Sequence, residues 1–251
     1  MSAITVDNVA FRYDPGRSIL DGISLSVEKG RNLGIVGESG SGKTTLLRLL
    51  LGLARPSSGS ILIGGQALDT GDRAFMRGFR RRVQAVFQDP YSSLDPRQSV
   101  FDIVAEPLRS LKIEGDIVSA VTGALQDVGL PPEAIRRFPH EFSGGQRQRI
   151  AIARAIVARP EFVMADEVVS ALDLSTRILI VDLLKTLSTS VTFVIVSHDI
   201  ALIALLCPDI VILERGRIVE SGLTERVLSN PEHPYTQRLL ASIPRLPPVM
   251  T

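Results

Sequence analysis

The stretch Gly37-Glu38-Ser39-Gly40-Ser41-Gly42-Lys43-Thr44 decides the fold of this 251-residue chain. It matches the pattern G-x-x-x-x-G-K-[ST], the phosphate-binding loop known as the P-loop. An apolar run over residues 33–36 precedes it and a leucine-rich helical pattern over residues 45–53 follows it. This is the strand–loop–helix order that the motif requires. The alternative, a glycine- and serine-rich turn with an incidental Lys-Thr pair, does not account for that context.

The motif predicts how a phosphate would be held. Glycines let the loop wrap closely, so that backbone N–H groups and the N-terminus of the following helix face phosphate oxygens. Lys43 is expected to reach the β- and γ-phosphates, and the Thr44 hydroxyl to bind Mg²⁺. The residues expected to contact the nucleotide here are Gly37, Glu38, Ser39, Gly40, Ser41, Gly42, Lys43, Thr44 and Thr45.

The composition is that of an ordinary globular protein, with 45 % apolar and 22 % charged residues. The formal net charge is +1, so nothing indicates a nucleic acid as partner. A single cysteine, Cys207, excludes an intrachain disulfide and is expected to be a small buried side chain. The N-terminus lacks a secretory signal pattern and no apolar run reaches roughly 18 residues, so we expect neither a leader nor a membrane span.

Short apolar runs and helical patterns divide the chain into three parts, of which the first, before residue 89, consists mainly of short strands. After Pro160 strands and helices alternate, which favours a buried parallel sheet. Between residues 89 and 159 helical patterns dominate, which indicates a helical subdomain inserted into the core. The basic cluster of Arg77, Arg80, Arg81 and Arg82 is interpreted as a solvated strand edge, in preference to a phosphate- or RNA-binding site. The predicted strands are 4–9, 24–27, 33–36, 60–64, 83–87, 162–165, 191–196 and 210–213, and the predicted helices are 45–53, 100–111, 116–128, 145–158, 175–187 and 200–206.

Two acidic residues follow the apolar strand at residues 162–165. Asp166 and Glu167 stand where a P-loop protein places its second group of nucleotide-site residues. Because consecutive strand residues point to opposite sides, the two carboxylates are expected to have different roles. Asp166 would hold Mg²⁺, directly or through water, and Glu167 would face the attacking water.

A second glycine-rich helix start is found at Phe142-Ser143-Gly144-Gly145-Gln146. Glycines permit close approach of a phosphate, and a helix N-terminus offers N–H groups and a positive dipole end. Taken by itself, this segment is better explained as a glycine-rich turn that caps a helix.

In their order along the chain, these motifs resemble one family, the ATP-binding cassette (ABC) ATPases, and the resemblance covers essentially the whole chain. Two departures are found: Phe142 stands where the family usually has Leu, and Val168-Val169 where Pro-Thr is common. Neither removes a catalytic group, although the second can alter the rigidity of the loop that holds Glu167. Besides the P-loop, the matching residues are Tyr13, Gln88, Ser143, Gly144, Gly145, Gln146, Asp166, Glu167, the segment 170–173 that ends in Asp173, and His198.

The resemblance implies an α/β fold: a P-loop NTPase (RecA-like) core with a mainly parallel sheet, an N-terminal antiparallel β subdomain and an inserted helical subdomain. By this resemblance, residues 1–251 would form a single ABC ATPase domain. Residues 1–88 and 160–230 would form the nucleotide-binding core with its antiparallel part. Residues 89–159 would form the helical subdomain, and 231–251 a short C-terminal tail.

The resemblance also implies roles for the matching residues, with ATP and Mg²⁺ as cofactors. Tyr13 would stack on adenine. Residues 143–146 and Asp173 would contact ATP held by a second subunit, in a head-to-tail dimer that is either homo- or heteromeric. The implied catalytic residues are Lys43, Gln88, Glu167 and His198, and the implied Mg²⁺ ligands are Thr44, Gln88 and Asp166.

Three stretches narrow the resemblance to the dipeptide/oligopeptide/nickel importer group: residues 86–97, 138–142 and 233–237. This group implies an ATP-hydrolysing subunit that powers the uptake of peptides, nickel or a related small solute. It would sit at the cytoplasmic face of the inner membrane, with membrane permease subunits as partners, a substrate-binding protein as an indirect one, and no nucleic acid. No cysteine lies near the C-terminus, so no iron–sulfur cluster or zinc is expected there. The alternative is an ATPase subunit of a soluble assembly such as the carbon–phosphorus lyase complex, which the segments 220–224 and 233–237 also suit. Residues 89–97 favour the importer.

Overall fold

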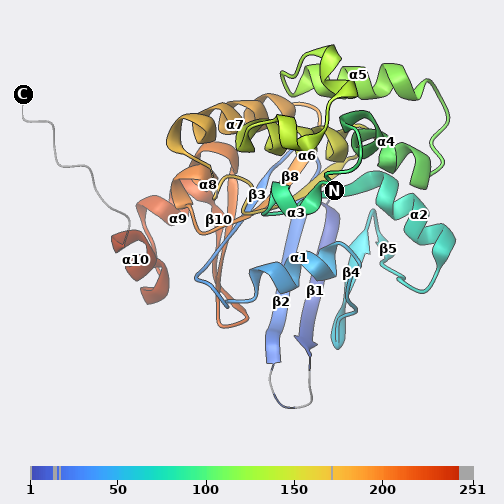
Figure 1. Cartoon of the computed structure of the whole chain (residues 1–251). Coiled ribbons are helices and arrows are strands. Elements are labelled where there is room, and N and C mark those ends of the chain that lie inside the picture. Colours follow the sequence, from blue (N-terminus) through green and yellow to red (C-terminus); the bar gives the residue numbers. More distant parts are fainter. Residues whose placement is uncertain (1, 14–15, 17, 171, 243–251) are drawn as a thin grey trace, which may run out of the picture.

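Two β-sheets form the framework of the computed structural model, which describes residues 2–13, 16, 18–170 and 172–242 (Figure 1). One sheet is antiparallel, in the order β2 (Ser18–Glu28), β1 (Ser2–Arg12), β4 (Ser58–Ile63) and β5 (Gln66–Ala67). The other is parallel from β9 to β6, with β10 antiparallel at its edge. Its order is β10 (Arg217–Leu223), β9 (Asp209–Glu214), β3 (Leu33–Val36), β8 (Thr192–Ser197), β7 (Phe162–Asp166) and β6 (Val83–Val86).

The register of the parallel strands brings three chain segments together at the carboxyl end of the sheet. Val36, the last residue of β3, pairs with Ser197 at the end of β8. Asp166, the last residue of β7, pairs with Val196. Because the strands are parallel, their carboxyl ends lie together at the same end of the sheet, where α/β proteins usually bind ligands. The P-loop, the acidic pair and the segment around His198 therefore start from adjacent points.

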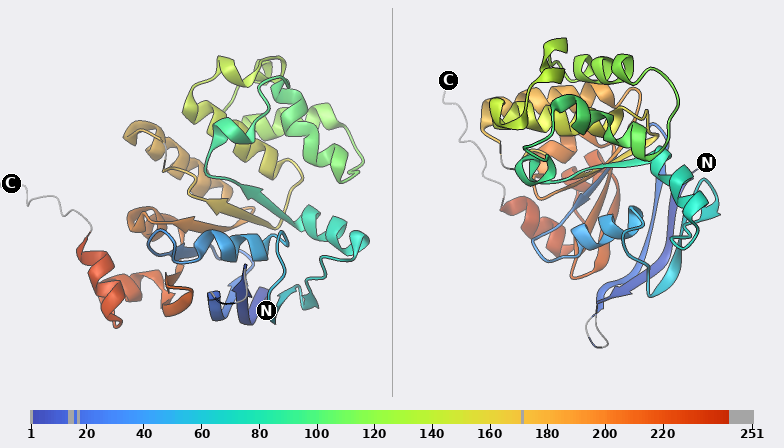
Figure 2. Two further views of the ribbon diagram at one scale, coloured as in Figure 1. Left: turned by 60° about the horizontal axis from the view of Figure 1, so that its bottom comes forward. Right: turned by 45° about the vertical axis from the view of Figure 1, so that its right-hand side comes forward.

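The two faces of the parallel sheet bury different partners. In β7, Phe162 and Met164 pack with α1 and the antiparallel sheet, whereas Val163 and Ala165 pack with the long helices of the other face. This alternation follows the period of two in a strand. Views from other directions show α1 and the long helices on opposite sides of the sheet (Figure 2). The helices are α1 (Lys43–Leu50), α2 (Arg73–Arg82), α3 (Pro90–Ser93), α4 (Val100–Ser110), α5 (Ile117–Asp127), α6 (Gly144–Ile156), α7 (Leu174–Leu187), α8 (Ile200–Leu206), α9 (Thr224–Ser229) and α10 (Pro234–Ala241), with 3₁₀ turns at Pro132–Arg136 and Pro139–Glu141.

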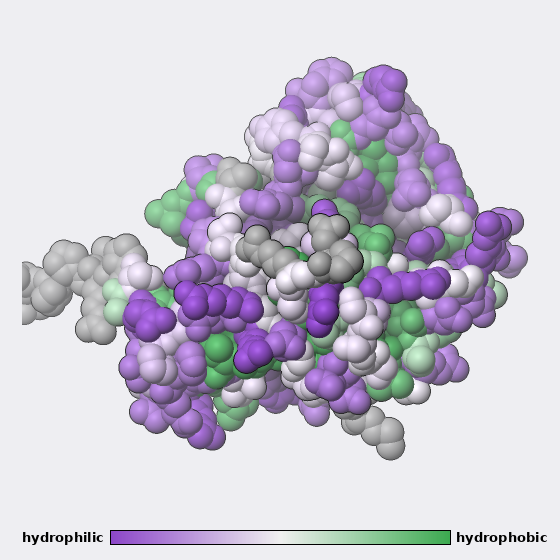
Figure 3. Space-filling view, turned by 90° about the horizontal axis from the view of Figure 1, so that it is seen from below, coloured by the Kyte–Doolittle hydropathy of each residue, from purple (hydrophilic) through white to green (hydrophobic). Residues whose placement is uncertain are grey.

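The predicted fold class is confirmed: α3 to α6 form a helical insertion between β6 and β7, beside a mainly parallel core and an antiparallel sheet (Figure 1). Seen from below the view of Figure 1, the surface is largely hydrophilic, with apolar side chains in separate groups (Figure 3). In the part of the chain that the structure describes, no helix has the length and apolar character needed to cross a membrane.

The prediction for the basic cluster was wrong, because Arg77 and Arg80 to Arg82 lie on helix α2. Asp72 caps this helix by accepting from the N–H groups of Ala74 and Phe75. Arginine is a good helix former, and Met76 and Phe79, three residues apart, are buried along one side. Helices α9 and α10 and strand β10 were not among the predicted elements.

Candidate nucleotide site

A cleft of about 540 Å³ opens at the carboxyl ends of β3, β7 and β8. It gathers most of the predicted site residues of the core into one place. Two residues that the family resemblance did not include also contribute to it: Ile19 lines the cleft, and Arg48 lies beside Tyr13. The lining consists of Tyr13, Ile19, Ser39, Gly40, Gly42, Lys43, Thr44, Thr45, Gln88, Asp166, Glu167 and His198.

The P-loop needs glycine where it approaches other segments. Gly42 has a φ of 108°, and a Cβ atom there would lie 2.7 Å from Leu20 Cδ2. A Cβ atom on Gly37 would collide with the carbonyl oxygen of Leu213. Gly42 is the N-cap of α1 and provides no side-chain cap. The first turn of α1 therefore points its N–H groups at the cleft without a side chain of its own to satisfy them.

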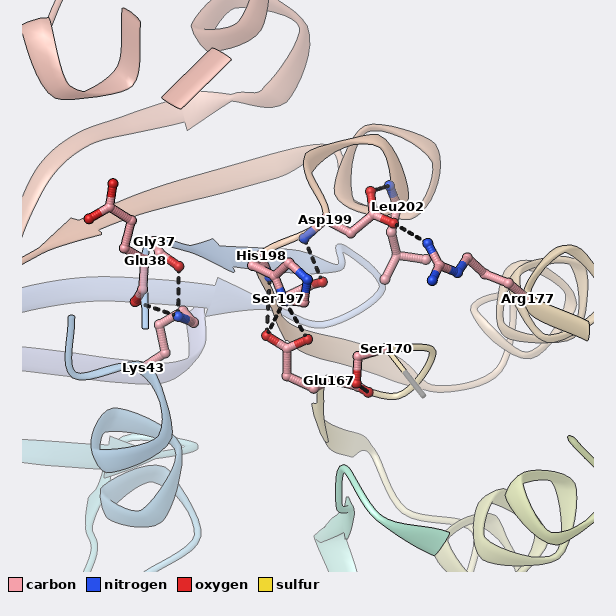
Figure 4. A network of polar contacts seen from close by, with 10 residues as sticks. All are labelled: Gly37, Glu38, Lys43, Glu167, Ser170, Arg177, Ser197, His198, Asp199 and Leu202. Atoms are coloured by element: carbon pink, nitrogen blue, oxygen red, sulfur yellow. Dashed lines mark hydrogen bonds and ion pairs between the residues drawn. The ribbon is translucent and has the colours of Figure 1, made fainter. Parts of the chain in front are cut away.

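Lys43 crosses the inside of the loop (Figure 4). Its Nζ donates to the carbonyl oxygens of Gly37, at 2.6 Å, and Glu38, at 2.8 Å. The residue is only 8 % exposed, and burial lowers the pKa of its ammonium group, while the nearby carboxylates of Glu167 and Asp166 oppose that change. An anion that entered the cleft would meet a partly desolvated cation, and such a cation binds phosphate more strongly than a solvated one does.

Asp166 ends β7 inside the cleft and is 6 % exposed. Burial, followed by the charge of Glu167, raises the pKa of its carboxyl group, although a hydrogen bond from Thr44 and the charge of Lys43 act against this. Its Oδ1 atom is buried and has no hydrogen-bond partner among the described residues. A buried, unsatisfied carboxylate oxygen beside a threonine hydroxyl is a donor set that suits a hard cation such as Mg²⁺.

Glu167 and His198 form a pair across the ends of β7 and β8 (Figure 4). The backbone N–H of His198 donates to Glu167 Oε1 at 3.2 Å, and the ring Nδ1 lies 2.9 Å from Oε1 and 2.8 Å from Oε2. The Glu167 side chain is 13 % exposed and that of His198 66 %. The imidazole therefore shields the carboxylate on the solvent side.

The expectation that Asp166 and Glu167 face opposite sides of a strand was wrong. Both side chains line the same cleft. Strand β7 ends at Asp166, and Glu167 adopts a left-handed backbone with a φ of 49°. Its N–H donates to Val196 O at 2.9 Å, which holds this unfavourable conformation in place. The turn brings the second carboxylate back over the cleft.

Tyr13 stands at the rim of the cleft and is 56 % exposed. Its ring meets Phe11 edge to face, with centroids 4.8 Å apart. A hydrogen bond with Thr45, and then one with Arg48 at 3.5 Å, lower the pKa of its hydroxyl. The face of the ring is thus held in an accessible position. Gln88, which follows β6, contributes to the same lining.

The second glycine-rich segment lies elsewhere, since none of residues 143–146 is among the described residues that line the cleft. Ser143 caps α6: its Oγ accepts from Gln146 N at 3.3 Å, and Gln146 Oε1 accepts from Ser143 N at 3.0 Å. A Cβ atom on Gly145 would collide with Thr176 on α7. Asp173, also outside the cleft lining, caps α7 by accepting from Thr176 N at 3.0 Å and Thr176 Oγ1 at 2.7 Å. One chain therefore assembles only part of the predicted site.

Comparison with known proteins identifies the family. Residues 20–170 match the family model described as ABC transporter. Residues 219–251 match a second model, described as the C-terminal region of oligopeptide/dipeptide transporters.

Two relatives illustrate the similarity. A Brucella ovis protein that carries the name of a peptide import ATP-binding protein is 44 % identical over 230 residues, which cover 90 % of this chain and 73 % of the relative. The glutathione import ATP-binding protein GsiA of Escherichia coli is 45 % identical over 226 residues, 88 % of this chain but 36 % of its own length.

Solved structures agree with the fold. CbiO1 of Clostridium perfringens, described as part of an ABC transporter complex, superposes with a TM-score of 0.82 at 28 % identity, over 91 % of each chain. A dimeric ATP-binding cassette in a post-hydrolysis state, bound to ADP and Pi, gives a TM-score of 0.78 at 29 % identity, over 88 % of this chain and 98 % of the other. This chain belongs to the ABC transporter family, as an ATP-binding and ATP-hydrolysing protein of its oligopeptide/dipeptide group.

Proposed function

We propose that this chain hydrolyses ATP to drive an importer for peptides or related small solutes through membrane permease subunits. The observation that carries the proposal is the cleft, in which Lys43, Asp166, Glu167 and His198 lie together. The names of the relatives, which refer to peptide import and glutathione import, support the solute class. In such an importer a substrate-binding protein would deliver the solute, and the chain would sit at the cytoplasmic face of the inner membrane.

Within the cleft, each residue has a role that its position supports. Lys43 and the backbone N–H groups of the P-loop would neutralise the β- and γ-phosphates. Glu167 would accept a proton from the attacking water, whose oxygen bonds to the γ-phosphorus as the bond to the β-phosphate oxygen breaks. His198 would hold Glu167 and contact the γ-phosphate. Tyr13, at the rim, would stack on the adenine ring.

Mg²⁺ fits the donors present, because Asp166 offers an unpartnered buried oxygen beside Thr44. Thr44, Asp166 and Gln88 would hold the ion, which supplies charge neutralisation at the β- and γ-phosphate oxygens when bound. Asp166 orients its carboxylate through the Thr44 hydroxyl. Glu167 would not bind the ion, because its carboxylate pairs with His198. It would act on the attacking water instead.

A second subunit would complete the site. Residues 143–146 offer another helix N-terminus, yet they do not line the cleft of their own chain. In a head-to-tail dimer, this segment and Asp173 of one chain would close on ATP held by the P-loop of the other. The dimeric state of the ADP-bound structural relative supports this arrangement.

The test is purification of the tagged chain from detergent-solubilised membranes of its native host. We expect integral membrane subunits to co-purify, and peptides to stimulate ATP hydrolysis by the resulting complex after reconstitution in vesicles with a substrate-binding protein. Recovery with soluble enzymes alone would contradict the importer proposal and support the soluble-assembly alternative.

A further inference from the structure

The C-terminal part of the chain contacts the P-loop directly. Tyr235 on α10 lies 197 positions after Glu38, yet its hydroxyl accepts a hydrogen bond of 2.9 Å from the Glu38 backbone N–H. Tyr235 is 3 % exposed, and burial raises the pKa of its hydroxyl, so the phenol stays neutral. Tyr235 lies within the region that matches oligopeptide/dipeptide transporters, whereas Glu38 lies within the 20–170 match to the general ABC transporter model.

Several contacts fix α10 in place. The Glu220 carboxylate on β10 accepts from the N–H groups of Glu232, at 2.9 Å, and His233, at 3.1 Å. His233 is the N-cap of α10, and its Nδ1 accepts from Tyr235 N at 3.2 Å. One turn further, Arg238 lies 3.6 Å from Glu214 on β9. The phenol is therefore held on a helix that is anchored to β9 and β10 of the larger sheet.

Glu38 is the second residue of the P-loop, two positions after β3 ends at Val36, and its backbone N–H and carbonyl oxygen are both hydrogen-bonded. Tyr235 holds its N–H, while its carbonyl oxygen accepts from Lys43 Nζ at 2.8 Å and from Ser41 N at 3.2 Å. The carbonyl bonds come from within the loop itself. Among the described residues, the hydrogen bond to Tyr235 is the one that ties the Glu38 backbone to an element outside the loop.

We propose that Tyr235 is a positioning residue for ATP binding: its hydroxyl fixes the first turn of the P-loop from α10. The loop then keeps one shape when Lys43 leaves the Gly37 and Glu38 carbonyl oxygens to meet the phosphates. A binding loop that is already ordered loses less conformational entropy when the ligand arrives. Without the hydroxyl, the Glu38 N–H loses its acceptor and the loop samples other shapes.

The test compares two variants that each remove one hydroxyl from neighbouring buried residues of α10. Tyr235→Phe keeps the ring, which also keeps water away from the Glu38 N–H. Thr236→Val is the matched control, since Thr236 is fully buried and none of the hydrogen bonds of the described residues joins it to the P-loop. By calorimetry with Mg-ATP, we expect binding to Tyr235→Phe to be weaker by about three- to tenfold. Thr236→Val is expected to bind like the wild type.

Steady-state kinetics separate positioning from a general loss of structure. For Tyr235→Phe we expect KM for ATP to rise while kcat at saturating ATP stays close to that of the wild type. Equal ATP affinity in Tyr235→Phe and wild type would overturn the proposal. So would an equal loss in Thr236→Val, because the effect would then belong to helix packing. A wild type that itself failed to bind ATP would instead contradict the function of the site.

Hydrogen exchange tests the bond between Tyr235 and Glu38 before any nucleotide is bound. Before nucleotide is added, we expect the Glu38 amide to exchange slowly, because Tyr235 holds it. In Tyr235→Phe the same amide should exchange faster, with unchanged protection in the core strands β3 and β8. Fast exchange of the Glu38 amide in the wild type would overturn the proposal.

Discussion

Helices α1 and α6 both begin at glycine-rich segments, and they differ in whether a side chain accepts hydrogen bonds from the N–H groups of the first turn. Helix α1 follows Gly42, which lends no side-chain cap. Helix α6 follows Ser143, which forms a reciprocal capping box with Gln146. The first helix start opens into the cleft, whereas the second bonds to itself. The open start is ready for a phosphate within its own chain, and the capped start has to release a side chain before it can bind one.

The cost of that release is modest, because an N-cap contributes typically about 1 kcal/mol. Charge-assisted bonds from a phosphate exceed this. A capped signature segment, residues 143–146, is therefore stable in the separate subunit and still able to bind ATP presented by another chain. We call the cleft with the start of α1 the α1 side, and the start of α6 with Asp173 the α6 side. The comparison predicts that substitutions on the α1 side affect ATP binding or hydrolysis within one chain, while substitutions on the α6 side affect assembly of the dimer.

The largest effect is expected for Glu167→Gln, on the α1 side. Removing a positioned general base typically lowers the rate by about two to four orders of magnitude. Glutamine keeps the size of the side chain, so ATP binding should persist and the ATP-bound closed dimer should accumulate. Phosphate release and size-exclusion chromatography with ATP measure both effects. Turnover near the wild-type rate would exclude Glu167 as the base.

On the α6 side, Ser143→Arg should abolish ATP-dependent dimer closure and hydrolysis, while each chain still binds ATP. A bulky side chain at this position blocks the close approach that Gly144 and Gly145 permit. Ser99→Arg is a matched control, since Ser99 also caps a helix of the same subdomain, α4. Both variants lose a cap and some thermal stability, but only Ser143→Arg should lose activity.

Mixing sharpens this test if the chain forms homodimers. A dimer of Ser143→Arg with Lys43→Ala has one composite site with both defects and one with neither. Partial recovery of ATP hydrolysis on mixing is expected if the two halves of a site come from different chains. No recovery would mean that each chain builds its whole site alone, and the head-to-tail arrangement would be wrong.

Lys43→Ala alone should weaken ATP binding by roughly one to two orders of magnitude, because the ammonium bonds to phosphate in the ground state as well. This distinguishes it from Glu167→Gln, which should lose turnover but keep affinity. Lys29→Ala serves as control, since the Lys29 side chain is 66 % exposed and pairs with Glu161 outside the cleft. Calorimetry with Mg-ATP measures the difference, and equal affinities for Lys43→Ala and wild type would contradict the role.

The α1 side could be predicted from sequence because its chemistry is local. The P-loop is one continuous stretch, and the strand endings that carry Asp166 and His198 follow apolar runs that any parallel sheet would bury. The turn at Glu167 could not be predicted, because its left-handed backbone depends on a bond to Val196 of the neighbouring strand. Whether residues 143–146 and Asp173 bind a second chain's ATP stays a prediction.

Helices α2 and α10 were missed in the sequence analysis for a related reason. Helix α2 is so rich in arginine that its two buried residues, Met76 and Phe79, carry most of its apolar signal. Helix α10 lies in the segment 231–251 that was predicted to be a short tail, and Pro234 at its first turn was the available sign of a helix start. Its contact with Glu38 links residues 197 positions apart, and no local pattern in the sequence encodes such a pairing.

The smallest effect concerns two acidic residues, one on each side of the comparison. Burial raises the pKa of Asp166, whereas hydrogen bonds, first from Ser175 and then from Thr176, hold the pKa of Asp173 well below its ordinary value. A carboxyl group with a raised pKa stabilises the fold below its unfolded-state pKa, and this contribution is lost as pH rises through the folded-state value. A lowered pKa acts oppositely: the stabilisation is present above the unfolded-state pKa and is lost as pH falls through the folded-state value.

At neutral pH the two asparagine variants should therefore shift the melting temperature in opposite directions when no nucleotide is added. Asp166→Asn removes a buried charge that folding has to desolvate, so Tm should rise by a few degrees. The gain should shrink as pH falls toward 3.8, the ordinary value of this carboxyl group, because the wild-type group then becomes neutral as well. Asp173→Asn loses a charged cap, so Tm should fall at neutral pH and still be lowered near pH 4, where Asp173 is ionised.

Scanning fluorimetry from pH 4 to pH 8 follows both variants, and added Mg-ATP gives the functional control. Because Asp166 is proposed to hold Mg²⁺, nucleotide should stabilise the wild type more than Asp166→Asn, reversing their order of stability. A gain for Asp166→Asn that did not change with pH would show that packing, and not charge, sets the difference. A loss at neutral pH would show that the carboxylate is already well satisfied within its own chain. The open and capped sides of the molecule would then not differ as proposed.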